Sequence, residues 1–226
     1  MKIGGLQKFS LIDYPGKLSA VIFTQGCNFR CPYCHNSDLV DPGKFGEQLS
    51  EDEIVSFLDS RKGKLDGLVI TGGEPTLQSD LIHFISKVKN LGFLVKLDTN
   101  GSRPEVIASL IDLNLIDYIA MDIKAPLDKY ALVSGVSGLD EKSKENIDLI
   151  MNSGVPYEFR TTLAKTLVTE EDVPRIRAMI KGAKKYRINQ FVPRETNLDT
   201  DLGAKESELF SEEEVADMQE AWQVGV

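Results

Sequence analysis

Apolar runs of strand length alternate with helix-like apolar periodicity along most of the chain. Leu18–Thr24 is short, apolar and rich in β-branched residues, which predicts a buried strand. Ser50 and Glu53 have the spacing of a capping box, and apolar residues then recur on one helical face. The alternation continues with predicted strands at Gly67–Thr71, Phe93–Leu97, Ile116–Ile123, Val155–Leu163 and Arg187–Val192, and with predicted helices at Leu81–Leu91, Pro104–Leu113 and Leu139–Asn152, from Thr169–Asp172 to about Lys185, and after a cap at Ser211 and Glu214.

Six strand–helix units in succession predict a parallel sheet with helices outside it. We therefore expect an α/β fold, a partial TIM-like (β/α)6 barrel that six units leave curled but unclosed. In such barrels the chemistry gathers at the C-terminal ends of the strands. A chain of 226 residues requires no second domain. We assign residues 1–226 to one domain, with the core at about 17–194 and a polar connection and final helix over 195–226.

The composition narrows the classes of function. Apolar residues make up 42% and charged residues 27% of the chain, as in ordinary globular proteins. The net charge of −9 argues against a nucleic acid or an anionic membrane as partner. No apolar run approaches membrane-spanning length, and the first twenty residues carry too many charges for a signal peptide. We expect a cytoplasmic protein, in a compartment that keeps thiols reduced.

All three cysteines lie in one short stretch, at Cys27, Cys31 and Cys34. Four kinds of site are compatible with parts of it. Cys31 and Cys34 have the spacing of a redox dithiol. Cys31 to His35 matches the C-x-x-C-H pattern of covalent haem attachment. Three cysteines with His35 could hold structural zinc. Three cysteines alone could hold an iron–sulfur cluster with one iron left open.

The spacing favours the last alternative. A dithiol leaves Cys27 unexplained, and haem attachment needs an export context. Zinc usually takes its ligands from two separated segments, whereas these thiols share one loop. A curled C-x-x-x-C-x-x-C loop suits three corners of a cubane, with the fourth iron free for a small molecule. From the loop alone, a cluster is favoured and zinc remains the alternative.

Polar residues recur where the predicted strands end. Gly72 and Gly73 let backbone approach a ligand closely, and the carboxylate of Glu74 beside them can accept from an ammonium group. The same residues would also make a plain tight turn. Asp98 and Asn100 end the third predicted strand and suit ribose hydroxyls, although Asn-Gly is also a turn signal.

The fourth and fifth predicted strands add charged groups. Asp122 and Lys124 are two apart, so their side chains point to one face of the strand. A structural ion pair is the plain alternative for them. Arg160 shares a face with Glu158 and Thr162, and an arginine in a barrel mouth needs an anion. A site with both charge signs is therefore expected at the strand ends.

The cysteine motif also carries a resemblance to known proteins. C-x-x-x-C-x-aromatic-C, with Tyr33 as the aromatic residue, resembles the signature of the radical S-adenosylmethionine (SAM) superfamily. The longer string Gly26–Asn36 resembles the activating enzymes of glycyl radical enzymes. These are the pyruvate formate-lyase activating enzymes and the anaerobic ribonucleotide reductase activating proteins. Phe9–Gly16 is similar to a segment of the latter's stand-alone variant, and the resemblance extends from about Lys8 to Arg194.

The resemblance implies a radical SAM core with a [4Fe–4S] cluster on the three cysteines and SAM on its open iron. Gly-Gly-Glu-Pro would hold the amino group of SAM, and Asp-x-Lys would face SAM. Arg160 would meet its carboxylate. Arg194 follows the sixth strand, where relatives have a SAM-contacting histidine, and would take a comparable place. His35 would pack beside the cluster. The implied SAM-binding residues are Tyr33, Gly72, Gly73, Glu74, Asp98, Asn100, Asp122, Lys124, Arg160 and Arg194.

The implied reaction is reductive cleavage of SAM, followed by removal of a hydrogen atom from a glycine of a partner glycyl radical enzyme. By resemblance the partner is anaerobic ribonucleotide reductase and the reductant is flavodoxin or ferredoxin. No catalytic acid–base residue is needed, because the radical chemistry belongs to the cofactor. The alternatives are a radical SAM enzyme with a small-molecule substrate, such as the deazaguanine-forming enzymes, and a non-enzymatic iron–sulfur or zinc protein.

Overall fold

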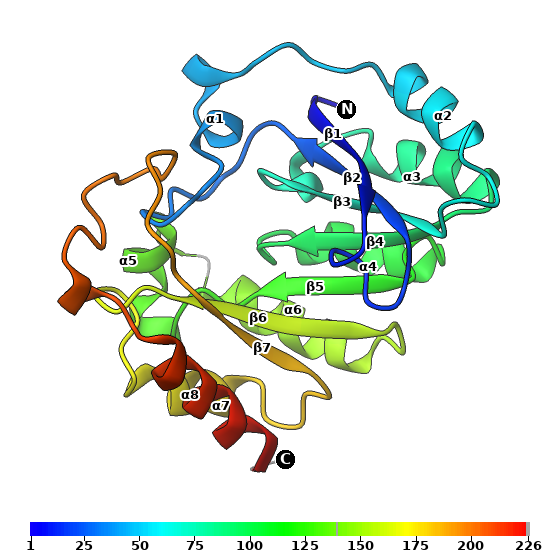
Figure 1. The fold of residues 1–226 in the computed structure, drawn as a ribbon. Coiled ribbons are helices and arrows are strands. Elements are labelled where there is room, and N and C mark those ends of the chain that lie inside the picture. Colours follow the sequence, from blue (N-terminus) through cyan, green and yellow to red (C-terminus); the bar gives the residue numbers. More distant parts are fainter. Residues whose placement is uncertain (139, 225–226) are drawn as a thin grey trace.

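A single curled sheet organises the protein, whose computed structural model describes residues 1–138 and 140–224 (Figure 1). The strands follow chain order across the sheet; the first pair is antiparallel and every later pair is parallel. The first and last strands stay unpaired with each other, so the predicted partial barrel is confirmed and open. The strands are β1 (Ile3–Ser10), β2 (Ser19–Thr24), β3 (Gly67–Gly72), β4 (Leu94–Thr99), β5 (Tyr118–Asp122), β6 (Tyr157–Leu163) and β7 (Tyr186–Gln190).

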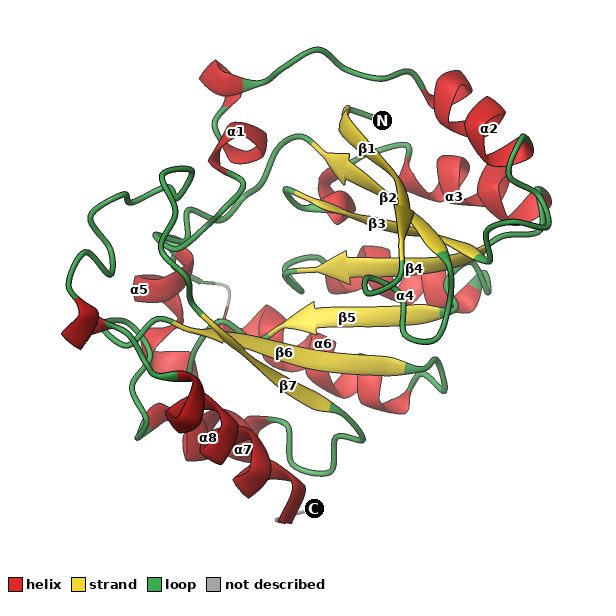
Figure 2. Cartoon of the chain, in the orientation of Figure 1, coloured by secondary structure: helices red, strands yellow, loops and turns green. Residues whose placement is uncertain are grey.

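Helices line the outer face of the sheet, and the C-terminal ends of the parallel strands point to the left in Figure 2. In the described residues, none of the helices has both the length and the apolar character needed to cross a bilayer. The helices are α1 (Ser37–Val40), α2 (Glu51–Asp59), α3 (Leu81–Asn90), α4 (Pro104–Asp112), α5 (Tyr130–Ser134), α6 (Asp140–Asn152), α7 (Asp172–Met179) and α8 (Glu212–Val224), with 3₁₀ turns at Pro42–Lys44, Pro75–Leu77, Leu127–Lys129 and Glu206–Glu208.

The helix ends follow local sequence chemistry. Ser50 and Glu53 form the predicted capping box at α2, with both reciprocal hydrogen bonds present. At α8, the Ser211 amide donates to the Glu214 carboxylate at 2.6 Å. The prediction for α7 is wrong at its C-terminal end: this helix stops at Met179, well before Lys185. The chain turns there through Gly182, whose φ of +88° is incompatible with a continuing helix. The predicted first residue of α6, Leu139, lies outside the described residues.

Strand β1 was not expected from the sequence. Gly4 and Gly5 are unfavourable inside a strand, and the polar residues that follow them interrupt the alternation of apolar and polar positions that would predict one. The backbone hydrogen bonds of β1 are made with β2, and the pairing runs from Ile3 opposite Thr24 to Ser10 opposite Ser19. A Cβ at Gly4 would lie 2.7 Å from the Gln25 side chain, so the close approach of β1 requires glycine.

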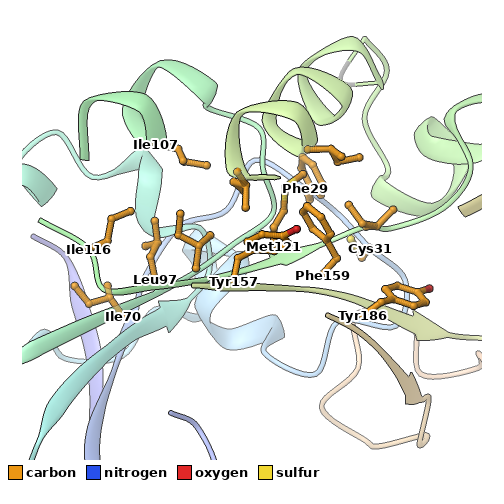
Figure 3. Packing of buried hydrophobic residues seen from close by; sticks show 14 of the residues in the cluster. Phe29, Cys31, Ile70, Leu97, Ile107, Ile116, Met121, Tyr157, Phe159 and Tyr186 are labelled. Atoms are coloured by element: carbon orange, nitrogen blue, oxygen red, sulfur yellow. The ribbon is translucent and has the colours of Figure 1, made fainter. Parts of the chain in front are cut away.

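The two faces of the sheet have different interiors. The outer face carries the main apolar core against the helices, where Figure 3 shows Met121 and Phe159 with Phe29 and Cys31 of the cysteine loop. The inner face carries a small cluster in which Tyr14 packs on Tyr118 with ring centroids 5.9 Å apart. The remaining inner side chains toward the C-terminal ends of the strands are polar or charged, and these build the site.

Candidate active site

The cysteine loop (residues 25–36) follows β2 and is held by backbone hydrogen bonds from three separate segments. The Gly26 carbonyl accepts from the Glu74 amide at 2.8 Å, after β3. The Arg30 amide donates to the Ser134 carbonyl at 2.7 Å, at the end of α5. The Leu198 amide, beyond β7, donates to the Cys34 carbonyl at 3.0 Å. Tertiary contacts thus fix a loop that has little regular structure of its own.

The three cysteines line one pocket together with residues from the ends of four successive strands. It contains about 700 Å³ of empty space, part of which is open solvent. Every sequence-predicted site residue except Arg194 lines it. The lining residues are Cys27, Phe29, Cys31, Tyr33, Cys34, Asn36, Val40, Thr71, Gly72, Gly73, Glu74, Asp98, Thr99, Asn100, Asp122, Lys124 and Arg160.

The three thiols differ in exposure: Cys31 is buried, whereas Cys27 and Cys34 are half-buried. Burial raises the pKa of Cys27 to about 12, with the Glu74 carboxylate adding to the effect. Burial also raises the pKa of Cys31, whose side chain is 6% exposed. The Phe29 amide donates to Cys27 Sγ at 3.3 Å. Since a metal or cluster takes thiolates, loading this site must release protons. Within residues 1–138 and 140–224, no three His, Cys, Asp or Glu side chains are arranged to hold a single metal ion.

The paired glycines bring the end of β3 against the cysteine loop. A Cβ at Gly73 would lie 2.1 Å from the Gly26 carbonyl oxygen, and one at Gly72 would lie 2.3 Å from the Thr24 nitrogen. Gly72 also has a φ of +112°, which side-chain-bearing residues rarely adopt. Gly73 therefore approaches the backbone of the cysteine loop itself, whereas Gly72 approaches the end of β2 just before that loop.

Glu74 is fully buried and joins the ends of β3 and β4. Its Oε1 accepts from Thr99 Oγ1 at 2.8 Å and from the Thr76 amide at 3.1 Å, while Oε2 accepts from the Asn100 amide at 2.7 Å. Burial raises the pKa of this carboxyl group, although its hydrogen bonds oppose the shift. Oε2 retains capacity for a further donor, because a carboxylate oxygen has two lone pairs.

Asn100 connects the end of β4 to the cysteine loop. Its Nδ2 donates to Asn28 Oδ1 at 3.0 Å and lies 3.9 Å from Cys27 Sγ. Asn28 Nδ2 in turn donates to Ser102 Oγ at 2.9 Å. Asn100 therefore helps to position the cysteine loop, while its predicted contact with ribose hydroxyls stays a prediction.

A charged network crosses the inner face of β4, β5 and β6. Lys96 Nζ contacts Asp98 Oδ1 at 2.6 Å, and Asp98 Oδ2 contacts an Arg160 guanidinium nitrogen at 3.0 Å. Arg160 Nε reaches Asp122 Oδ1 at 3.0 Å, and Lys124 Nζ reaches Asp122 Oδ2 at 3.0 Å. Lys96 was missed in the sequence because it lies in an apolar run. Its position two residues before Asp98 was the available signal, since such residues share a strand face.

Mutual attraction keeps this network charged. Lys124 and Arg160 hold the pKa of Asp122 at about 2, against the raising effect of its burial. Burial acts to lower the pKa of Lys124, but Asp122 and other neighbours raise it well above the ordinary lysine value. The Arg160 pKa is likewise raised by Asp98 and Asp122, despite burial. Asp122, Lys124 and Arg160 are therefore charged at neutral pH.

Replacing Asp122 with asparagine should destabilise the protein in a pH-dependent way. The folded pKa of about 2 is below the ordinary 3.8, so the stabilisation is complete above about pH 4. It is lost as the pH falls from there through 2. The difference in unfolding free energy between wild type and Asp122→Asn, measured with urea, should be large at pH 7 and shrink toward pH 2.

Asp59→Asn is the matched control, because Asp59 pairs with Lys62 on the exposed surface of α2. Exposed pairs of this kind contribute little to stability, so this variant should differ little from wild type at either pH. An Asp122→Asn difference that stays constant across the range would show that the network does not hold this carboxylate ionised.

The segment after β7 covers the other side of the cysteine loop. His35 Nε2 lies 3.0 Å from the Val192 carbonyl oxygen, and its ring stacks on Phe191 with centroids 6.0 Å apart. Burial lowers the pKa of His35, and the charge of Arg194 lowers it further. Arg194 itself is exposed and does not line the pocket. Tyr33 is buried, with its ring centroid 6.4 Å from that of Phe191 and 5.9 Å from Lys124 Nζ.

Comparisons with known proteins show the family to which the chain belongs. The description of the radical SAM superfamily matches residues 21–189. A Methanocaldococcus jannaschii protein, provisionally named a glycyl-radical enzyme activating enzyme, is 42% identical over 198 residues, or 85% of this chain and 81% of that protein. The pyruvate formate-lyase-activating enzyme of Clostridium pasteurianum is 30% identical over 208 residues, covering 86% and 82%. The structure of TYW1 with a lysine–pyruvate adduct superposes with a TM-score of 0.65 at 16% identity, covering 91% and 73%.

The match over the superfamily's core, on a partial barrel with three cysteines at one pocket, defines a radical SAM enzyme. Within that superfamily, the chain belongs to the family of glycyl-radical enzyme activating enzymes.

Proposed function

We propose that this protein cleaves SAM reductively at a [4Fe–4S] cluster and thereby activates a glycyl radical enzyme, with anaerobic ribonucleotide reductase as the partner. The observation that carries the proposal is the pocket at the strand ends, where three cysteines face a network of fixed charges. The names of the relatives support the class of reaction. The identity of the partner rests on the resemblance around Gly26–Asn36 and Phe9–Gly16.

The residues present fit a cluster. Three thiols around one cavity suit a cubane, which takes each thiolate on a different iron. Beside the thiols, Phe29 lines the pocket with an apolar ring that is 3% exposed and edge-on to Tyr130. When bound and reduced, the cluster would supply the electron that cleaves SAM to methionine and a 5′-deoxyadenosyl radical, which takes a hydrogen atom from the glycine.

The chain's own residues would bind and orient SAM. Glu74 Oε2 offers an acceptor for the amino group, and Arg160 offers a cation for the methionyl carboxylate. Asp98 and Asn100 lie where ribose hydroxyls would find acceptors and donors. Asp122 and Lys124 hold each other and Arg160 in place, so the donors are oriented before SAM arrives. The remaining predicted SAM-binding residues are Tyr33, Gly72 and Gly73 at the pocket wall and, outside the pocket lining, Arg194.

The partner surface follows from the open barrel. Because β1 and β7 do not pair, the sheet is not closed around the pocket. A glycine-bearing loop of a protein could enter from the open side, provided that it first leaves its own site, which makes weak binding the expectation. Flavodoxin or ferredoxin is the proposed reductant, and the cytoplasm the proposed location.

The proposal is tested by electron paramagnetic resonance. The reconstituted protein, mixed anaerobically with SAM, reductant and anaerobic ribonucleotide reductase, should generate a glycine-centred doublet. Deuterating that glycine should transfer label into 5′-deoxyadenosine. As a control, the reductase with its radical glycine changed to alanine should give neither doublet nor label.

Two other outcomes would replace the proposal. If 5′-deoxyadenosine takes label only from a labelled small molecule, the substrate is that molecule and the activating role fails. If dithionite and SAM yield no 5′-deoxyadenosine at all, the cleavage reaction itself is absent.

A further inference from the structure

Lys96 is a buried lysine inside the barrel whose role the proposed reaction leaves open. Its side chain is 2% exposed, and its ammonium group contacts Asp98 Oδ1 at 2.6 Å. The remaining neighbour of note is the ring of Tyr118, with its centroid 5.9 Å from Nζ. A buried lysine is expensive to desolvate, and a pair of this kind is weak evidence for stability. Stability alone therefore does not explain the buried charge of Lys96, and a role in the neighbouring site is considered.

The charges of the network do not cancel. Lys96, Arg160 and Lys124 are cations, whereas Asp98 and Asp122 are the carboxylates between them. Within these five residues, three positive and two negative charges leave an excess of one positive charge; the Glu74 carboxylate lines the same pocket, and Glu158 on the same strand face pairs with Lys185 at 3.2 Å. Without Lys96 the same network would be neutral, because Asp98 and Asp122 would balance Arg160 and Lys124.

We propose that Lys96 is a specificity-determining positioning residue: by neutralising Asp98 it leaves Arg160 free to attract the carboxylate of the methionyl group of SAM. Lys96 does not line the pocket, so it acts through Asp98 rather than by touching the ligand. This inference rests on the proposed function, since it assigns a role toward SAM in the same site.

The test compares two ligands that differ in that carboxylate alone. Decarboxylated SAM keeps the sulfonium, the amino group, the ribose and the adenine. In wild-type protein with its reconstituted cluster, SAM should bind more tightly than decarboxylated SAM. Lys96→Met should weaken SAM binding by roughly tenfold, the effect of one charge acting through partly buried protein, while leaving decarboxylated SAM within about twofold. Both dissociation constants are measured by anaerobic equilibrium dialysis.

A double variant separates charge from packing. Lys96→Met with Asp98→Asn restores an excess of one positive charge, from Arg160 and Lys124 against Asp122. The ratio of the two dissociation constants should therefore return toward the wild-type ratio, even if both ligands bind more weakly. Lys89→Met is the matched control, because Lys89 pairs with Asp117 at 2.7 Å just before β5, at the end of the strands away from the pocket. It should leave the ratio unchanged.

The outcomes distinguish the inference from the proposed function. If Lys96→Met weakens both ligands equally, or the double variant fails to restore the ratio, the lysine has only a structural role and the inference is overturned. If the wild-type protein with its cluster binds neither SAM nor decarboxylated SAM, the proposed function itself is wrong, and the inference about Lys96 falls with it.

Discussion

Replacing Cys27, Cys31 or Cys34 singly with alanine is expected to abolish SAM cleavage. Each thiol lines the same pocket, and a cubane that loses one of three protein ligands is no longer retained. Wild-type protein reconstituted anaerobically should be brown and contain about four irons per chain, the content of one cubane. Each variant should contain far less iron and form no 5′-deoxyadenosine with SAM and dithionite. Iron analysis and product chromatography make the measurement.

His35→Ala is the control that separates a cluster from a three-cysteine, one-histidine zinc site. In the structure His35 contacts the Val192 carbonyl and the ring of Phe191, and it does not line the pocket. Its removal should therefore leave the iron content near that of wild type. If the wild-type protein is colourless and contains stoichiometric zinc, and if His35→Ala loses that zinc as the cysteine variants do, the site holds zinc and not a cluster.

Gly73→Ala is expected to have the second largest effect, although Gly73 carries no side chain that could bind a ligand. Its Cβ would lie 2.1 Å from the Gly26 carbonyl oxygen, so one of the two backbones must move. That displacement breaks the Glu74–Gly26 hydrogen bond, which positions the cysteine loop against β3. Overpacking of this kind costs about 1–3 kcal/mol. Iron incorporation should fall several-fold, and the denaturation midpoint should drop.

Gly46→Ala provides the matched control for this substitution. Gly46 has no atom within 4 Å of an added Cβ, and its φ is not positive. The control variant should load iron as wild type does. If Gly73→Ala also loads normally, the close approach of the two loops is not what positions the cysteines.

Local signals in the sequence determined most of the fold. Apolar periodicity located β2 to β7, because buried strands and amphipathic helices differ in the spacing of their apolar residues. The capping boxes that begin at Ser50 and Ser211 predicted two helix starts, because a capping box involves residues only three positions apart in the sequence. The cysteine spacing and the polar strand ends located the pocket, because the C-terminal ends of parallel strands meet at one edge of a sheet.

Contacts between distant segments were decided only by the tertiary structure. Strand β1 makes its backbone hydrogen bonds with β2, and no local sequence pattern predicts an edge strand that is interrupted by glycines. The same holds for the network: Arg160 meets Asp98 and Asp122 only because β6 lies beside β5 in one register. The contact of Lys96 with Asp98 is local in the sequence, but only the packing of β4, β5 and β6 side by side brings Arg160 to the same carboxylate.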